Sequence, residues 1–300
     1  MDSPFRLRKG GLRFFGTECK LPDIIEEAED LALAGKYTEA LEKYDEAITA
    51  DPGDPLAFIG KASVLKAAGK FEECARCMDA ALSILPVWNV TENDKERLAA
   101  FTAMLLILKA EALLYAEKPE DALDAVNRAD RIHGADAASL VIRGQVYALQ
   151  KNYEEAGNCM YRAEEWCFLY DDLMLSQVWL LKIRFAKEAG SPFAPSYAAE
   201  LYQTGNWKKP IGTAGELFER GNNLRSEGLV YDALRYYDAC LAAEPENKAL
   251  VLFFKGIIFE QLKQFNEAFS VYSDALSAGP APEDDFKIRI RWANAKCLRT

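Results

Sequence analysis

One ordered set of small and large residues recurs along the chain with a period of about 34 residues. In its first copy, Ala40 is followed by the large Tyr44 four positions later, by Ala47 seven later and by Pro52 twelve later. Spacings of three, four and seven place side chains on one face of a helix, and proline ends such a helix. The order starts again at five further small residues: Cys74, Ala122, Ala156, Ala233 and Ala268.

A second helix signal precedes each of these sets. Twelve positions before Ala40 lies the small Ala28, and four before that lies the large Ile24. Gly35 and Gly69 stand where the two helices of a pair would be joined by a turn. Since one helix pair cannot bury its apolar face alone, the pairs must stack on one another. The sequence therefore predicts an all-α stack of antiparallel helix pairs.

This pattern resembles the tetratricopeptide repeat (TPR) family, most clearly in the run from Leu217 through Gly221, Ala233 and Tyr237 to Pro245. The resemblance implies a right-handed α-solenoid and a protein-binding role. It covers about six clear repeats, at 21–54, 55–88, 103–136, 137–170, 214–247 and 249–282, with one degenerate repeat between the fourth and fifth.

Breaks in the period divide the chain. Residues 21–170 hold repeats 1–4, and an excess of fourteen residues before Ala122 predicts one long helix at about 92–116. Residues 171–213 form a degenerate repeat and loop, which is a candidate hinge. Repeats 5–6 follow at 214–282. Residues 283–300 predict a C-terminal capping helix with a polar outer face, on which Trp292 packs against the last pair.

Residues 1–20 form a basic and aromatic N-terminal arm. Apolar and basic residues alternate about Gly10 and Gly11, which is typical of a hairpin. Three interpretations remain open: a disordered or loosely docked tail, an arm that contacts an acidic partner or nucleic acid, and an arm that folds into the protein's own groove.

Charge and composition narrow the function. The formal net charge of −11 would repel a phosphate backbone, so nucleic acid is an unlikely partner. The apolar runs are too short to predict a membrane span, and the N-terminus lacks the pattern of a secretory signal. Seven irregularly spaced cysteines do not suggest disulfides. We expect a cytoplasmic protein with reduced thiols.

No motif predicts catalysis, a cofactor or a metal site. Cys74 and Cys77 form a C-x-x-C pair, but both fall within a predicted helix and no second ligand pair is present. His133 is the single histidine and stands at a predicted helix end. The sequence also lacks a phosphate-binding loop. These observations predict a protein that is not an enzyme.

The family resemblance implies a concave groove lined by the first helix of each pair, where a partner peptide or amphipathic helix binds. Carried over position by position, the lining is Ile25, Glu29, Ile59, Ser63, Ile107, Glu111, Tyr115, Val141, Gln145, Phe218, Asn222, Arg225, Phe253 and Ile257. A groove occupied by the chain's own segments is the competing interpretation.

Chaperone-associated members of the family grip a carboxylate with Lys, Asn and Arg. Here only Asn222 matches that pattern, because Phe218, Phe254 and Glu29 occupy the other places. We therefore predict a protein-binding adaptor or assembly factor of a different specificity. A nucleic-acid-associated regulator that uses the N-terminal arm and a self-associating scaffold are the alternatives. The identity of the partner and the oligomeric state stay open.

Overall fold

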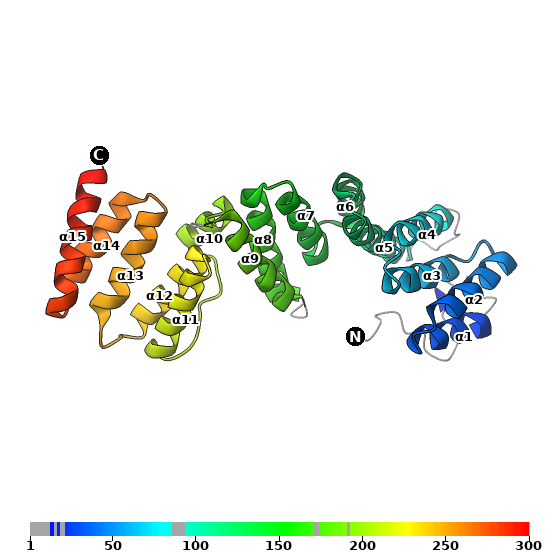
Figure 1. Cartoon of the computed structure of the whole chain (residues 1–300), viewed down its shortest axis with the longest axis horizontal. Helices are drawn as coiled ribbons and strands as arrows, with labels where there is room; N and C mark the ends of the chain where they lie inside the picture. The colour runs from blue at the N-terminus through cyan, green and yellow to red at the C-terminus, as the bar shows by residue number, and fades with distance from the viewer. Residues whose placement is uncertain are drawn as a thin grey trace. The chain divides into compact units, whose positions relative to one another are not determined.

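A computed structural model describes residues 13–14, 17–18, 22–85, 94–170, 174–190 and 193–299. The described part is a succession of helices, α1 to α15, with one short strand pair (Figure 1). The predicted all-α fold of paired helices is confirmed. The chain forms two compact units, Met1–Val146 and Tyr147–Thr300, which we describe separately. The right-handed course of the solenoid stays a prediction.

The strand pair lies near the N-terminus. Strands β1 (Arg13–Phe14) and β2 (Thr17–Glu18) are antiparallel, with Arg13 opposite Glu18. The predicted turn at Gly10 and Gly11 lies outside the described residues. The remainder of the predicted arm also lies outside the described residues.

Unit 1 is built from helix pairs. Its helices are α1 (Pro22–Leu33), α2 (Tyr37–Ala50), α3 (Pro55–Ala67), α4 (Phe71–Ile84), α5 (Lys95–Tyr115), α6 (Pro119–His133) and the greater part of α7 (Ala137–Leu149). Helix α3 begins with Pro55 after Asp54, whose carboxylate accepts a hydrogen bond from the Leu56 amide at 2.9 Å. Gly35 and Gly69 adopt positive φ angles of 77° and 73° at the predicted turns.

Small residues at the repeat positions let the helices approach closely. Ala28, Ala40 and Ala62 have no exposed surface. A methyl group added to Gly60 would lie 2.4 Å from the ring of the buried Tyr44. Close contact of this kind depends on alternating small and large residues. The periodic pattern of the sequence is therefore a packing pattern.

Helix α5 coincides with the long helix predicted at about 92–116. It is long and apolar enough to pass a length-and-composition test for a membrane span, which the sequence analysis did not predict. Its packing is that of a core helix, because Leu105, Leu106 and Ala110 are fully buried among neighbouring helices. Lys109 and Glu111 also form ion pairs with Asp79 and Lys66, each at 2.6 Å.

Unit 2 continues the pattern with one irregularity. Its helices are α8 (Tyr153–Tyr170), α9 (Leu175–Ala189), α10 (Ser196–Thr204), α11 (Ala214–Ser226), α12 (Val230–Ala242), α13 (Lys248–Gln261), α14 (Phe265–Ser277) and α15 (Pro282–Leu298). Within α11 and α13, Gly221 and Gly256 lie against the rings of Tyr237 and Tyr272. Each of these two contacts lies within one helix pair, whereas the contact of Gly60 with Tyr44 in unit 1 joins neighbouring pairs.

The irregular segment, predicted as a degenerate repeat, packs against its neighbours. Helix α9 lies against α8, and the short α10 contacts α8 and α12. The Asn158 carboxamide oxygen accepts a hydrogen bond from the Tyr197 amide at 2.9 Å, and its nitrogen donates to Ser196 Oγ at 3.2 Å. Phe193 also forms a parallel bridge with Leu229. These contacts attach α10 to the rest of unit 2.

Candidate functional site

The predicted groove residues of unit 1 and the adjoining α7 differ in accessibility. Ile25, Ile59 and Val141 are buried, with 2%, 4% and 2% of their surface exposed. They belong to the core and cannot meet a partner. The half-buried members are Glu29, Ser63, Ile107, Glu111 and Gln145. Tyr115 is exposed and stacks on Phe71 with ring centroids 5.1 Å apart.

The polar members of this part already have contacts within the chain. Glu111 pairs with Lys66 at 2.6 Å, and Ser63 Oγ donates to the Ile59 carbonyl at 3.1 Å. Glu29 behaves differently, because burial raises its pKa to about 7, with Asp30 and Glu26 adding repulsion. The described lining of unit 1 therefore combines core residues, an ion pair and one unusually weak acid.

The predicted groove residues of unit 2 form an aromatic cluster on α11 and α13. The Phe218 ring lies 5.7 Å from the Phe254 ring, which lies 5.6 Å from Phe253. The guanidinium carbon of Arg225 lies 5.0 Å from the centroid of Phe254. Phe218, Arg225 and Phe254 are half-buried, so part of each remains accessible. The predicted Ile257 is also half-buried on α13.

Two predicted groove residues are tied to second helices. Asn222 Oδ1 accepts a hydrogen bond from the Tyr237 hydroxyl at 2.8 Å. Phe253 is buried, with its ring 6.2 Å from that of Tyr272. Phe254 was not among the predicted groove residues, although it follows Phe253 directly. Phe218 and Phe254 thus occupy two positions that bind a carboxylate in the chaperone-associated members, and here their rings contact each other.

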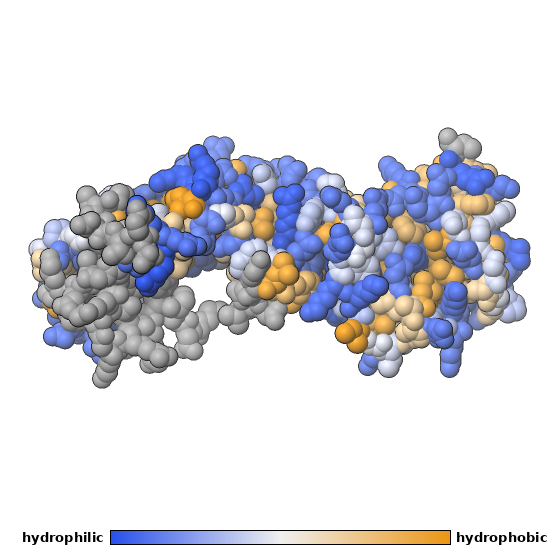
Figure 2. All heavy atoms as spheres, turned by 180° about the vertical axis from the view of Figure 1, so that it is seen from behind, coloured by the Kyte–Doolittle hydropathy of each residue, from blue (hydrophilic) through white to orange (hydrophobic). Residues whose placement is uncertain are grey.

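On the face shown in Figure 2, hydrophobic residues form separate patches between hydrophilic ones. An accessible apolar surface usually marks an interaction site only where its residues are contiguous. The contiguous cluster of unit 2 is therefore the better candidate for a partner.

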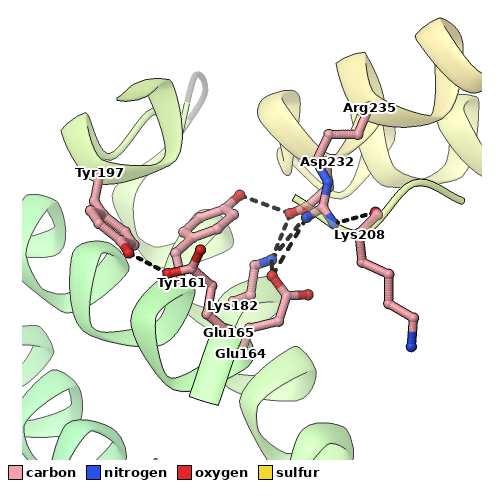
Figure 3. Close-up of polar contacts among 8 residues, drawn as sticks. All are labelled: Tyr161, Glu164, Glu165, Lys182, Tyr197, Lys208, Asp232 and Arg235. Atoms are coloured by element: carbon pink, nitrogen blue, oxygen red, sulfur yellow. Dashed lines mark hydrogen bonds and ion pairs between the residues drawn. The ribbon is translucent and has the colours of Figure 1, made fainter. Parts of the chain in front are cut away.

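The sequence analysis missed a buried charge network in unit 2 (Figure 3). Lys182 of α9 has no exposed surface, and its Nζ lies 3.1 Å from Glu164 of α8 and 2.8 Å from Asp232 of α12. The Tyr161 hydroxyl donates to Asp232 at 2.7 Å. Arg235 completes the network at 3.2 Å from Asp232. Two cations and two carboxylates thus balance each other.

The pKa directions show how the charges are held. Burial acts to raise the pKa of Asp232, but Lys182 and Arg235 outweigh it, and the pKa lies below its usual range. Burial raises the pKa of Glu164 despite Lys182, with Asp232 adding repulsion. Asp232 is thus the firmly ionised member. Because these groups are shielded from solvent, the network has no access for a substrate and holds helices together.

The network extends to the loop after α10. The Arg235 guanidinium donates to the Lys208 carbonyl at 3.1 Å, and its carbon lies 4.9 Å from the Trp207 ring. Trp207 stacks with Tyr202 at 6.3 Å. A signal was present in the sequence: Lys182 stands in an otherwise apolar stripe with Val178 and Phe185. A charged residue at such a position requires a buried partner.

The cysteines and the histidine that could have served in catalysis or metal binding lie within α4 and at the end of α6. Burial, followed by the neighbouring Cys77, raises the pKa of the Cys74 thiol to about 11, and burial also raises that of Cys77. Reactive cysteines show the opposite shift. His133 is the last residue of α6. Across the described ranges, no group of three or more His, Cys, Asp or Glu side chains is arranged to hold a metal ion.

Comparisons with solved structures find related architectures. A tetratricopeptide repeat protein from Parabacteroides merdae is 16% identical, and the match covers 91% of this chain and 98% of that chain with a TM-score of 0.42. YrrB, a TPR protein with an unusual peptide-binding site, is 14% identical, with 82% and 97% covered and a TM-score of 0.38. The pilF protein of Pseudomonas aeruginosa is 13% identical, and the match covers 89% of this chain and 95% of that chain with a TM-score of 0.37. No curated protein sequence matches the chain.

The TM-scores are too low to carry the assignment, which rests on family models. Models described as tetratricopeptide repeat match residues 31–88, 107–164 and 218–283, more than half of the chain. The matched segments contain α2–α4, α6, α7 and α12–α14 in full and parts of α5, α8 and α11. The chain therefore belongs to the tetratricopeptide repeat family.

Proposed function

We propose that the chain is a non-catalytic adaptor or assembly factor that holds a segment of another protein against α11 and α13. The observation that carries this proposal is the contact between the half-buried rings of Phe218 and Phe254, beside Arg225. Aromatic and arginine side chains contribute most strongly to binding where the partner packs against them and excludes water fully.

The same surface offers polar groups that could position a partner segment. Asn222 uses its carboxamide oxygen to accept from Tyr237, which leaves its amide nitrogen to donate. The Arg225 guanidinium supplies further donors and no acceptor. Both groups suit backbone carbonyls or carboxylates of an extended or helical partner. We therefore infer apolar capture of one or two partner side chains, with orientation set by hydrogen bonds from Asn222 and Arg225.

The proposal is confined to the unit 2 surface. The corresponding part of unit 1 is weaker as a candidate, because Ile25 and Ile59 are buried and Glu111 is paired with Lys66. The nucleic-acid alternative depends on the basic arm, most of which lies outside the described residues. It stays a prediction, as do the cytoplasmic location and the absence of catalysis.

Selection from a random peptide library on the full chain, followed by fluorescence anisotropy, would test this function. We expect Phe218→Ala and Asn222→Ala each to lower the affinity for the selected peptides by about tenfold or more. Phe254→Ala is a further variant of the same surface. Phe253→Ala is less suitable, because Phe253 packs in the core against Tyr272.

The matched control is Ile211→Ala, which removes a 98% exposed apolar side chain outside the surface. Its affinity for the same peptides should equal that of the wild type. Equal affinity of the Phe218→Ala and Asn222→Ala variants, with circular dichroism showing intact helices, would remove this surface as the binding site.

A further inference from the structure

The C-terminal helix α15 has a buried inner face and an exposed outer face. Ile288 and Ala295 are fully buried. The indole of Trp292 donates to Ser273 Oγ at 2.9 Å and its ring lies 5.3 Å from Phe269, as expected for a cap on α14. The outer face was predicted to be polar. Instead it carries Phe286 and Ile290, which are 68% and 47% exposed.

The exposed apolar residues follow one line along the helix. Phe286, Ile290, Ala293 and Cys297 are separated by four, three and four positions, and all are exposed. This spacing is that of the contact seam of paired helices. Ile288 and Ala295 lie on the opposite side of α15, so the seam is not a margin of its packed face. We call these four residues the outer seam.

Beyond the first turn of α15, the charges beside the outer seam are basic. The three acidic residues of α15 are all in its first turn, at Glu283, Asp284 and Asp285. Every later charged residue to Arg299 is a cation, in a chain of net charge −11. Lys287 and Arg289 pair with Asp284 and Asp285 on the surface, yet their side chains stay 62% and 65% exposed. Lys296 is exposed about two turns beyond Arg289.

We propose that the outer seam binds an amphipathic helix of another protein whose apolar face is flanked by aspartate and glutamate residues. The apolar line matches the i, i+3, i+4, i+7 pattern of such a helix. The flanking Lys287, Arg289 and Lys296 match its carboxylates, and such charges select a partner and its orientation. This surface is separate from the one on α11 and α13.

A second copy of the chain fits this surface less well. An antiparallel pair of α15 helices that matches Phe286 to Cys297 would place Arg289 beside Lys296 of the other copy. A parallel pair would place Arg289 beside Asn294 of the other copy and would supply no carboxylate. Like charges at flanking positions disfavour pairing, whereas carboxylates favour it. The charge pattern therefore decides in favour of an acidic partner.

Two designed helical peptides with the same apolar face would test the inference. One carries Glu at the flanking positions and the other carries Lys, and anisotropy measures the binding of each to the full chain. We expect the Glu peptide to bind at least about tenfold more tightly than the Lys peptide, and this preference to shrink as salt is raised. Ile290→Glu and Lys296→Glu should each lower the affinity for the Glu peptide by about tenfold.

Two control variants separate this site from other sites. Phe218→Ala on the α11 surface and Ile211→Glu in an exposed loop should leave binding of the Glu peptide unchanged. If Phe218→Ala abolished it, the peptide would be using the α11 surface and the outer seam would be rejected. Equal binding of both peptides, or unchanged binding by Ile290→Glu, would also overturn the inference.

Two further measurements compare the competing occupants. Analytical ultracentrifugation that showed a dimer lost in Ile290→Glu would replace the acidic helix with a second copy. Sedimentation with vesicles rich in phosphatidylglycerol that depended on Ile290, together with no preference for the Glu peptide, would replace it with an anionic membrane surface. We expect a monomer that does not sediment with these vesicles.

Discussion

The buried cation Lys182 gives the sharpest residue-scale test. Lys182→Met removes one of the two buried cations that Glu164 and Asp232 share, the other being Arg235, and breaking a buried ion pair costs about 3–5 kcal/mol. The matched change Lys66→Met removes a partly exposed partner of Glu111 and should cost about 1 kcal/mol or less. Urea denaturation compares the two free energies of unfolding. Equal losses would show that the network of Lys182 contributes no more than a surface pair.

A second residue-scale prediction concerns two glycines in neighbouring repeats. Gly256→Ala would place a methyl group 2.3 Å from the fully buried ring of Tyr272, so we expect a loss of about 1–3 kcal/mol. Gly215→Ala meets nothing within 4 Å in α11, and alanine favours the helix by up to about 1 kcal/mol. The midpoint of thermal denaturation should therefore fall in Gly256→Ala and rise in Gly215→Ala. A shift in the same direction would contradict the packing argument.

At the scale of elements, α1 carries five carboxylates and no basic residue. The pKa of Glu29 rises from 4.5 to about 7, so the folded state holds this proton more tightly than the unfolded chain does. Stability should then fall as pH rises from about 4.5 through 7, because the folded carboxyl loses its proton in a partly buried place, beside Asp30 and Glu26. Glu29→Gln should remove this dependence and raise the urea midpoint at pH 8.

The control for α1 is Glu42→Gln, which changes an exposed carboxyl on α2. Its urea midpoints at pH 5 and pH 8 should follow those of the wild type. A wild-type and a Glu29→Gln protein with the same pH dependence would show that Glu29 titrates normally.

Helix α10 provides a second element-scale prediction. Asn158→Ala removes the hydrogen bonds to Ser196 and Tyr197 that connect α8 to the start of α10. Hydrogen exchange of 196–204 should become faster, because a short helix depends on such contacts. Exchange of α13 should stay the same. Unchanged exchange in α10 would mean that Phe193, Pro195 and the aromatic contacts of Tyr202 suffice to hold it.

The helices of the regular repeats could be predicted from the sequence because their packing is local and periodic. Gly256 and Tyr272, for example, stand in columns that recur in every repeat. Lys182 could not be assigned a role in this way, because its partners Glu164 and Asp232 come from helices on either side of an irregular segment. The outer face of α15 was mispredicted for a related reason: the expectation of a polar cap came from repeat proteins in general, not from Phe286 and Ile290.

At the scale of the whole molecule, the chain divides into two compact units after Val146, and the predicted run of four repeats to residue 170 stays a prediction. The boundary falls inside α7, because Ile142 and Val146 pack in the core of unit 1 while α8 packs against α9. The repeat period continues through α7, so the sequence pattern did not indicate a boundary between units there. The groove residues that the sequence placed in one lining therefore divide between the units, and the aromatic cluster is found in unit 2.

The network around Lys182 also affects the order in which unit 2 assembles. Repeat proteins fold mainly through contacts between near neighbours in sequence, which form rapidly. Tyr161 and Asp232 are 71 residues apart, so their contact must wait until α8, α9 and α12 have met. An interaction that forms after the rate-limiting step slows unfolding without speeding folding. The network would then slow the unfolding of unit 2 more than it speeds its folding, and so lengthen the lifetime of the folded state.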